Sequence, residues 1–361
     1  MKWIECTLGD ILNFRRGYDL PHSEMSGGDI PVAGSNGVIG YHNKATDISP
    51  VITIGRSGNV GTPYIYDRAW AHNTTLFIDD FKGNDPLYLY YLIKTLPLAS
   101  FGGGSAVPTL NRNHIHPLIV KHCPDVEEQK RIASFLNAFD EKIELNKRIN
   151  HNLLNVAQEI FDSEVARIHS YTDSYKKSSL LGIADYLNGV AMQKYPTLGS
   201  EDGLPVLKIK ELGQQFCDST SDRCTKNIPD QYVVHDGDIV FSWSGTLLVD
   251  FWCGGECGLN QHLFKVSARG YPAWFAFFWT KHHLDRFIRI AKDKAVTMGH
   301  IKRSDLGKAE VYVPDEDSLR TIDSIIDPLV AEFIGRRVET RELQLLRDSL
   351  LPELMTGHLT C

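Results

Sequence analysis

The stretch that decides the fold is residues 124–167, which read PDVEEQKRIASFLNAFDEKIELNKRINHNLLNVAQEIFDSEVAR. Its apolar side chains recur at alternating steps of four and three residues, which is the spacing of a coiled-coil seam. The apolar seam positions are Ile132, Leu136, Phe139, Ile143, Leu153, Ala157 and Ile160. Two positions of the same seam hold Asn146 and Asn150 instead. The pattern predicts one long helix whose buried face contains two polar side chains.

A second copy of this pattern runs from Pro314 to the C-terminus, 190 residues after the first. Its apolar seam positions are Ile322, Ile326, Leu329, Phe333, Leu343 and Leu350. Its polar positions, Arg336 and Thr340, fall at the same two places as Asn146 and Asn150. Two helices with matching seams most simply pair with each other, and buried polar residues at matching places make that pairing specific in register.

The segments that precede the two helices are also similar to each other. Each consists of short β-rich runs broken by Gly, Asn and Pro, followed by an aromatic-rich helical stretch. Gly58 matches Gly245, and fifteen residues later Asn73 matches Asn260. The order is therefore domain, helix, domain, helix, and an internal duplication of this length sets the architecture.

We therefore expect an α+β protein with two similar globular domains, each followed by a long helix, and with the two helices paired as an antiparallel coiled coil. The expected boundaries are a first domain at 1–123, a helix at 124–169, a linker at 170–179, a second domain at 180–313, and a helix with a C-terminal tail at 314–361. Helices of this length form a rod of roughly 60 Å. Pro328 lies inside the second helix and predicts a kink there.

Composition limits the classes of function. The formal net charge is −7 and the pI is near 6.1, which is not the basic balance of a free-standing DNA-binding protein. Any nucleic-acid surface must be local or shared with a basic partner. The segment from Met1 to Leu12 already contains Glu5 and Asp10, so we expect no signal peptide. The seven cysteines are expected to be reduced thiols of a cytoplasmic protein.

Four stretches make the chain similar to a known family. They are IPV at 30–32 with GSNGVIGYHN at 34–43, ITIGRSGNVG at 52–61, EQKRIA at 128–133, and LRDSLLPELMTG at 346–357. Together with the domain-helix-domain-helix order, they resemble the specificity (S) subunits of type I restriction-modification systems, over essentially the whole chain.

The resemblance implies that each domain is a target recognition domain that reads one half of a bipartite, gapped site in double-stranded DNA. It implies that the paired helices set the gap and dock two modification (M) subunits, which carry S-adenosylmethionine and the methyltransferase activity. Restriction (R) subunits would join for ATP-dependent cleavage. This chain itself would bind no cofactor, hold no catalytic residue and contact no membrane.

Reading bases in the major groove requires forked donors or donor–acceptor side chains, such as Arg for guanine and Asn or Gln for adenine. The candidates in the first domain are Arg15, Arg16, Tyr18, Asn36, Arg56, Asn59, Asn73, Asn111 and Arg112. Those in the second domain are Gln193, Lys194, Asn260, Gln261, His262, Lys302 and Arg303. Each of them singly is also explained as a surface or capping residue; as a set they fall in loops at matching places of the repeat.

Two departures separate the halves. The second domain has Ser242-Trp243-Ser244-Gly245-Thr246 where the first has a loop with Arg56, and the second helix lacks the Glu-Gln-Lys start of the first. The second half also holds the most basic stretch, with Arg286, Arg289, Lys292, Lys294, Lys302, Arg303 and Lys308. That stretch is explained equally by phosphate contacts and by a solvated helix face.

Enzyme signals are weak. The loop 55–61 lacks the Gly-Lys-Ser/Thr ending of an ATP loop, and Cys217, Cys224, Cys253 and Cys257 lack the spacing of a zinc knuckle. We therefore expect no metal site and no catalysis. The alternative to DNA reading is a coiled-coil scaffold in which the duplicated domains bind proteins.

Overall fold

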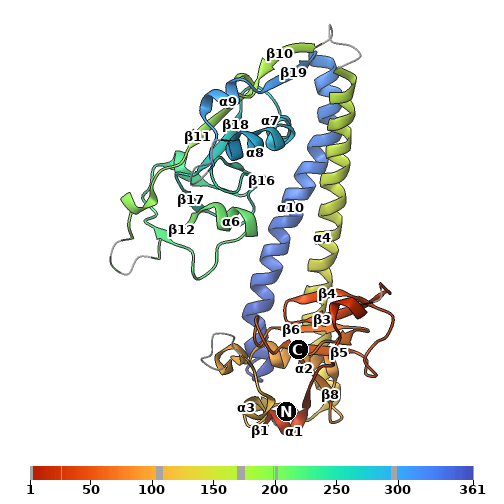
Figure 1. Ribbon diagram of the computed structural model, residues 1–361. Coiled ribbons are helices and arrows are strands. Elements are labelled where there is room, and N and C mark those ends of the chain that lie inside the picture. Colours follow the sequence, from red (N-terminus) through yellow and green to blue (C-terminus); the bar gives the residue numbers. More distant parts are fainter. Residues whose placement is uncertain are drawn as a thin grey trace. The chain divides into compact units, whose positions relative to one another are not determined.

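The computed structural model describes residues 3–25, 27–102, 109–168, 175–197, 199, 202–293 and 299–360 (Figure 1). The chain divides into two compact units, one of residues 1–141 with 344–361 and the other of residues 142–343. The two long helices, α4 (Val126–Ile168) and α10 (Glu316–Met355), contribute a segment to each unit. The fold is mixed helix and sheet, as the sequence predicts.

The first unit contains a four-stranded sheet in the order β2-β8-β5-β6, a three-stranded sheet in the order β4-β3-β7, and the pair β1-β9. The strands are β1 (Ile4–Thr7), β2 (Asn13–Arg16), β3 (Ile30–Gly34), β4 (Gly37–His42), β5 (Val51–Gly55), β6 (Pro63–Tyr66), β7 (Trp70–Ala71), β8 (Thr75–Asp80) and β9 (Ile119–His122). The helices are α1 (Leu8–Ile11), α2 (Pro86–Lys94), α3 (Arg112–Ile115) and the short 3₁₀ turns η1 (His22–Glu24) and η2 (Leu98–Phe101).

One apolar core joins the sheet of the first unit to both long helices. Tyr88 and Leu92 of α2 are buried there with Leu136 of α4 and Leu354 of α10. α2 begins where the sequence favours it, because Asp85 caps the helix by accepting a hydrogen bond from the Tyr88 N–H at 2.8 Å. The helix segments in this unit are therefore fixed against the domain by burial of a shared apolar face.

Gln129 fastens the start of α4 to the first domain. Its side chain is fully buried; Nε2 donates to Asn84 Oδ1 at 2.8 Å and to the Cys123 carbonyl at 2.7 Å, while Oε1 accepts from the Asp85 N–H at 2.8 Å. Every polar atom of the amide is thus satisfied, as burial requires. This explains the glutamine in the Glu-Gln-Lys start of the first helix. Leu319, at the matching place in α10, is partly buried against the apolar core of the second unit instead.

The second unit repeats this plan. Its sheets have the orders β11-β18-β15-β16 and β13-β12-β17-β14, with the pair β10-β19. The strands are β10 (Tyr175–Ser179), β11 (Ala184–Asn188), β12 (Leu204–Leu207), β13 (Arg223–Cys224), β14 (Val233–Val234), β15 (Ile239–Ser242), β16 (Val249–Phe251), β17 (Cys257–Leu259), β18 (Leu263–Ala268) and β19 (Glu310–Pro314). The helices are α5 (Leu180–Ile183), α6 (Ile209–Gln214), α7 (Ala273–His282), α8 (Leu284–Asp293), α9 (Arg303–Gly307), η4 (Met192–Lys194) and η5 (Asp230–Tyr232).

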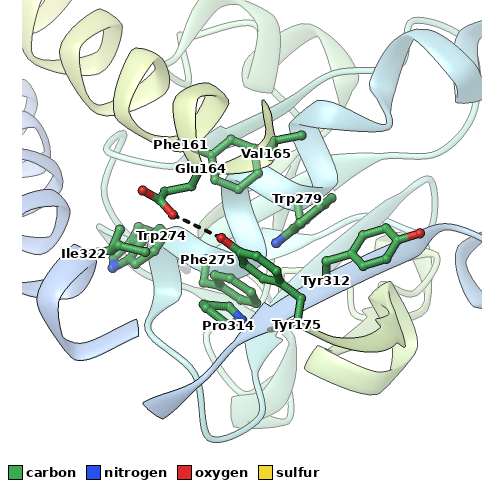
Figure 2. Close-up of a pocket in the computed structure, with 10 residues that line it drawn as sticks. All are labelled: Phe161, Glu164, Val165, Tyr175, Trp274, Phe275, Trp279, Tyr312, Pro314 and Ile322. Atoms are coloured by element: carbon green, nitrogen blue, oxygen red, sulfur yellow. Dashed lines mark hydrogen bonds between the residues drawn. The ribbon is translucent and has the colours of Figure 1, made fainter. Parts of the chain in front are cut away.

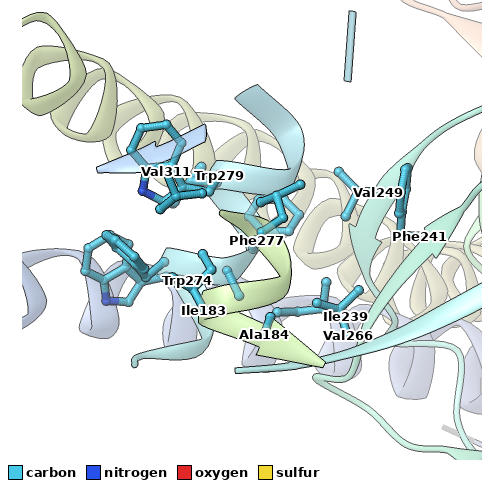
Figure 3. Packing of buried hydrophobic residues seen from close by; sticks show 14 of the residues in the cluster. Ile183, Ala184, Ile239, Phe241, Val249, Val266, Trp274, Phe277, Trp279 and Val311 are labelled. Atoms are coloured by element: carbon cyan, nitrogen blue, oxygen red, sulfur yellow. The ribbon is translucent and has the colours of Figure 1, made fainter. Parts of the chain in front are cut away.

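The repeat is visible element by element. The series β1-α1-β2 returns as β10-α5-β11, and the antiparallel pair β1-β9 returns as β10-β19. The core of the second unit is rich in aromatic side chains, among them Trp274, Phe277 and Trp279 of α7 and Phe241 of β15 (Figure 3).

Residues 175–179, which the sequence analysis assigned to a linker from their polar composition, form the strand β10 because they pair with β19 along all five residues. Residues 170–174 of that stretch lie outside the described part.

α4 and α10 pair in antiparallel fashion within each unit. In the second unit Asn146 Nδ2 donates to Glu339 Oε2 at 2.8 Å, Arg336 Nη1 donates to Asn146 Oδ1 at 3.0 Å, and Lys142 pairs with Glu339. In the first unit Arg347 pairs with Asp140, which also accepts from the Tyr91 hydroxyl at 2.7 Å. Residue numbers that rise along one helix meet numbers that fall along the other, as an antiparallel coiled coil requires.

All the apolar seam positions predicted from the sequence are fully or partly buried. The fully buried ones are Ile132, Leu136, Ile143, Ala157, Ile326 and Phe333, and the partly buried ones are Phe139, Leu153, Ile160, Ile322, Leu329, Leu343 and Leu350. Of the polar positions, Asn146 and Asn150 are buried, and Arg336 and Thr340 are partly buried. The helix continues through Pro328, whose ring is exposed.

The alignment of the two domains needs one correction. Tyr18 bridges to His72 and Val190 bridges to Asn260, while the N–H groups of Gly17 and Gly189 donate to Thr75 and Leu263. Asn260 therefore occupies the place of His72, and Gln261 the place of Asn73, so the match of Asn73 with Asn260 is wrong by one residue. The spacing between the Gly58 and Gly245 loops and the strands that follow them differs by one residue between the repeats.

Gly17 and Gly189 occupy the same position of the repeat for a steric reason. A Cβ atom on Gly17 would lie 2.1 Å from the His72 carbonyl oxygen, and one on Gly189 would lie 2.2 Å from the Asn260 carbonyl oxygen. Only glycine allows two backbones to approach this closely. The end of β2 is thereby held beside the segment that precedes β8, which brings together side chains far apart in sequence.

Candidate nucleic-acid interface

Five of the nine candidates in the first domain line one open cavity of about 400 Å³. The lining residues are Arg15, Arg16, Arg56, Leu76, Thr109, Leu110, Asn111 and Arg112. Four segments supply them: the end of β2, the start of β8, the loop after β5, and the start of α3 with the residues just before it. The Leu110 N–H donates to the Arg56 carbonyl at 2.7 Å and Ser57 bridges to Thr109, which joins the last two segments. Four guanidinium groups thus converge in a protein that is acidic overall.

Asp19 bonds two of the candidates, Arg16 and Asn73. It forms a two-fold ion pair with Arg16, with Nη2–Oδ1 at 2.8 Å and Nη1–Oδ2 at 3.2 Å, and it accepts a hydrogen bond from the Asn73 amide. Arg56 Nη1 in turn donates weakly to the Asn73 carbonyl at 3.5 Å. The hydrogen bond from Asn73 and the ion pair with Arg16 lower the pKa of Asp19. Asp19 is therefore ionised at neutral pH and orients the Arg16 guanidinium.

Arg15 and Arg112 are held differently. The Arg15 guanidinium lies over the Tyr18 ring, with Cζ 5.4 Å from the ring centroid. Arg112 Nη1 donates to the Phe14 carbonyl at 3.2 Å. The Phe14 N–H donates to His116 Nε2 at 3.0 Å, and burial together with the charge on Arg112 lowers the pKa of His116. A neutral His116 and Arg112 thus bind the two backbone groups of Phe14 and hold β2 at the edge of the cavity.

The other first-domain candidates have local structural roles or stand apart. Asn111 caps α3 by accepting from the Asn113 N–H at 3.0 Å, and Asn59 accepts from the Thr62 hydroxyl at 3.0 Å in its own loop. Asn36 is exposed in the tight turn between β3 and β4, outside the cavity. These bonds favour a local structural role for both residues, as a helix cap for Asn111 and as a loop contact for Asn59.

In the second unit Arg303 repeats the role of Arg112. Its Nη1 donates to the Tyr186 carbonyl at 2.8 Å, and Tyr186 of β11 corresponds to Phe14 of β2. Trp243 takes the place of Arg56, because the Ile301 N–H donates to its carbonyl as Leu110 does to that of Arg56. Trp243 Nε1 donates to Asn188 Oδ1 at 2.9 Å. In the second domain, the hydrogen-bonded pair of Trp243 and Asn188 thus replaces the arginine network of the first domain.

Four of the remaining second-domain candidates lie in two groups. Gln193 and Asn260 line a second open cavity of about 410 Å³, together with Met192, Pro196, Thr197, Val206, Lys208, Asp222 and Arg223. His262 shares a hydrogen bond with the Ser244 hydroxyl at 3.0 Å and contacts the Trp243 ring, while Gln261 beside it is exposed. Lys194 is exposed, and Lys302 is exposed at the start of α9.

The basic stretch on α8 and α9 is partly explained by packing. Arg286 Nη1 donates to the Lys308 carbonyl at 3.1 Å, which ties α8 to the end of α9, whereas Arg289 and Lys292 are exposed. Lys294 lies outside the described residues. Phosphate contact by Arg289 and Lys292 stays a prediction.

A separate apolar pocket lies in the second unit (Figure 2). It holds about 20 Å³ among Phe161, Val165, Trp274, Phe275, Trp279 and Ile322, with Tyr175 donating to Glu164 Oε2 at 3.5 Å at its side. None of the DNA-binding candidates lines it. Its walls belong to the aromatic core, so we assign it to packing.

Among the described residues no group of three or more His, Cys, Asp or Glu side chains is placed to hold a metal ion. Cys224, Cys253 and Cys257 are buried, and Cys217 is partly buried. Burial raises the pKa of Cys217 to about 12 and that of Cys253 to about 11. None of the helices in the described part of the chain is both long and apolar enough to span a membrane.

Sequence reasoning identified the arginines of the cavity but not Asp19, which connects Arg16 with Asn73. No local signal marks Asp19 as part of a site, because its partner Asn73 is 54 residues away. Asp19 and Asn73 meet because the backbone at Gly17 lies against the segment before β8, and this approach is known only from the fold.

Comparison with known proteins agrees with this architecture. Residues 1–155 match the family described as type I restriction modification DNA specificity domain. The chain is 27% identical over 303 residues, 75% of its own length and 68% of the other, to the type I restriction enzyme MjaIX specificity subunit of Methanocaldococcus jannaschii. Residues 1–155 thus have the sequence pattern of a DNA specificity domain of type I restriction-modification systems.

Further similarities extend this result. The chain is 23% identical over 212 residues, 57% of its length, to the EcoBI specificity subunit of Escherichia coli, of which the alignment spans 44%. The crystal structure of the S subunit of a type I restriction-modification system from M. genitalium has the same fold, with a TM-score of 0.66 at 16% identity over 98% of this chain and 96% of the other.

Proposed function

We propose that this specificity subunit reads a bipartite, gapped site in double-stranded DNA, with residues 1–123 reading one half and residues 180–313 the other. The observation that carries the proposal is the cavity where Arg15, Arg16, Arg56 and Arg112 converge in an otherwise acidic chain. Guanidinium groups suit both phosphates and the guanine edge in the major groove. A protein-binding scaffold would have no need to concentrate them in one concave site.

The two paired helices set the distance between the recognition domains and dock two modification subunits, and restriction subunits join this assembly for cleavage. The antiparallel pairing supports this role, since the Asn146–Arg336 and Asp140–Arg347 contacts fix the register of α4 against α10. Register determines the length of the spacer, and so the gap.

The chain itself supplies recognition and no catalysis. The buried Tyr91 hydroxyl donates to Asp140 of α4, and the partly buried Asp250 pairs with Arg337 of α10, so these two titratable groups serve contacts with the long helices. The partner subunits would supply the chemistry and much of the phosphate attraction. We therefore expect the isolated subunit to bind DNA weakly, in keeping with its net charge of −7.

The test is to map methylated bases in cells that express this chain with its modification subunit, and in cells that express the modification subunit alone. Methylation of a two-part gapped sequence only in the presence of the chain supports the proposal. Exchange of residues 1–123 for the first domain of a relative should then change one half of the sequence and leave the other unchanged.

A triple substitution sharpens the test. Arg15→Gln, Arg16→Gln and Arg56→Gln together should abolish recognition of the first half-site, while Arg68→Gln, at an exposed arginine outside the cavity, is the control for loss of a surface charge. If the methylation map is the same with and without the chain although the subunits co-purify, DNA reading is refuted and the scaffold interpretation replaces it.

A further inference from the structure

We propose that the first recognition domain reads a guanine, and that Arg15 is the side chain that reads it. This inference rests on the proposed function, and it adds the base that one named residue recognises. It starts from the different states of the four guanidinium groups in the cavity, which are not interchangeable.

Three of the four arginines use part of their donors on the protein. Arg16 is bound through both terminal nitrogens by the Asp19 carboxylate. Arg112 donates to the Phe14 carbonyl, and Arg56 donates weakly to the Asn73 carbonyl. These three side chains shape the cavity, neutralise one carboxylate and hold backbone segments together.

Arg15 is the exception. It is exposed, it lines the cavity, and among the described residues no carboxylate forms an ion pair with it. Its guanidinium lies over the face of the Tyr18 ring, with Cζ 5.4 Å from the ring centroid. A ring contact leaves the N–H edge of the guanidinium available, and that edge forms two parallel hydrogen bonds to acceptors such as O6 and N7 of guanine.

Tyr18 makes this placement rigid. Its ring is partly buried and packs against Trp70 and Phe77, with centroids 5.4 and 5.7 Å away. Arg15 is therefore held against a ring that is fixed by the core, two residues before Gly17, whose backbone position admits no side chain. A pre-positioned guanidinium loses less conformational entropy on binding, which favours base reading over loose attraction to phosphate.

The second domain lacks an arginine stacked on a tyrosine at this position. The arginine and the aromatic ring are both missing there, since Leu187 replaces Arg15 and Val190 replaces Tyr18. The other two arginine positions hold Asn188, in place of Arg16, and Trp243, in place of Arg56. Guanine reading by this position is therefore a property of the first half-site alone. The two halves of the DNA sequence should differ in composition at the equivalent place.

The experiment uses the complex of this chain with its modification subunit and the gapped site found by methylation mapping. Domain exchange assigns one half-site to residues 1–123, and duplexes are then made in which each base pair of that half is replaced in turn. Binding of every duplex is measured for the wild type, for Arg15→Lys, which keeps the charge but loses the fork, and for the control Arg68→Lys, an exposed arginine outside the cavity.

We expect one G·C pair at which replacement weakens wild-type binding by about 5- to 150-fold, the range of a good bidentate contact. Arg15→Lys should lose a similar factor on the cognate duplex and become indifferent to that pair, whereas Arg68→Lys should match the wild type. Thermal melting of each variant confirms that folding is unchanged.

The inference is overturned if the first half-site contains no G·C pair, if Arg15→Lys binds the cognate duplex like the wild type, or if it weakens all duplexes equally, which is the behaviour of a phosphate contact. These results leave the methylation map dependent on the chain. A map independent of the chain refutes the proposed function instead, so the two failures are distinguishable.

Discussion

Arg336 donates a hydrogen bond to Asn146 Oδ1 at 3.0 Å, and the two residues occupy the same position of the two repeated helices, 190 residues apart. A residue of one helix thus meets its own counterpart in the other. In an antiparallel pair this happens only at the centre of the repeat, so the contact marks the middle of the paired segment. Glu339 completes it by accepting from the Asn146 amide at 2.8 Å.

The two buried asparagines of α4 should respond in opposite ways to replacement by leucine. Asn146→Leu should lower the free energy of unfolding by about 1–3 kcal/mol, because Arg336 and Glu339 lose a buried partner. Asn150 Oδ1 is buried without a hydrogen-bond partner among the described residues, so Asn150→Leu should be neutral or stabilising. Urea unfolding of the two variants measures the contrast, and a larger loss for Asn150→Leu would contradict it.

Gln129→Leu, which gives α4 the apolar residue that α10 has at Leu319, should destabilise the first unit. The Asp85 N–H and the Cys123 carbonyl would lose their partner, at about 1–3 kcal/mol for each buried group left unsatisfied. Lys130→Ala is the control, since that exposed side chain makes one surface ion pair. Thermal unfolding should show a lower Tm for Gln129→Leu alone, and equal Tm values would refute the role of the buried amide.

The sequence was most informative where a pattern repeats along the chain. The seam of Ile132, Leu136 and Ile143 follows from periodicity, which needs no knowledge of tertiary contacts. Strand β10 was not predicted, because its polar residues form a strand only through pairing with β19. Likewise Asp19 joins the cavity through Asn73, a partner that only the fold brings near. Contacts between distant segments depend on geometry that residue types do not encode.

Asp19→Asn should make DNA binding less selective. Hydrogen bonding from Asn73 and pairing with Arg16 lower the pKa of Asp19, so the wild-type carboxylate stays ionised at any pH above its unfolded pKa of about 3.9. The network it forms is present above that pH and is lost as the pH falls through the lowered pKa. Removing the charge frees Arg16 for phosphate.

For this variant we expect tighter binding of nonspecific duplexes and a dependence of log K on log salt that is steeper by about one unit. Fluorescence anisotropy of the complex with the modification subunit, measured at several salt concentrations near pH 7, provides both quantities. Asp67→Asn, at an exposed carboxylate outside the cavity, is the matched control. An unchanged slope would show that Arg16 does not reach phosphate.

Cys253 should react slowly with alkylating reagents in the native protein. Burial raises the pKa of its thiol to about 11, so at pH 8 only about one molecule in a thousand carries the reactive thiolate. Iodoacetamide labelling followed by peptide mass spectrometry should show Cys253 unmodified before, and fully modified after, unfolding in urea. The reactivity should increase as the pH approaches 11. Rapid labelling of the native protein at pH 8 would contradict the buried position of this thiol.

Gly17 and Gly189 are required by the backbone arrangement of each domain, whereas the side chains beside them differ between the domains. The close backbone approach at these glycines positions the loop ends whatever the side chains beside them are. The neighbours have in fact diverged, to Arg15 and Arg16 in one domain and Leu187 and Asn188 in the other, on the same strand arrangement. New target sequences are therefore accessible by few substitutions, in evolution or by engineering, without rebuilding the scaffold that presents them.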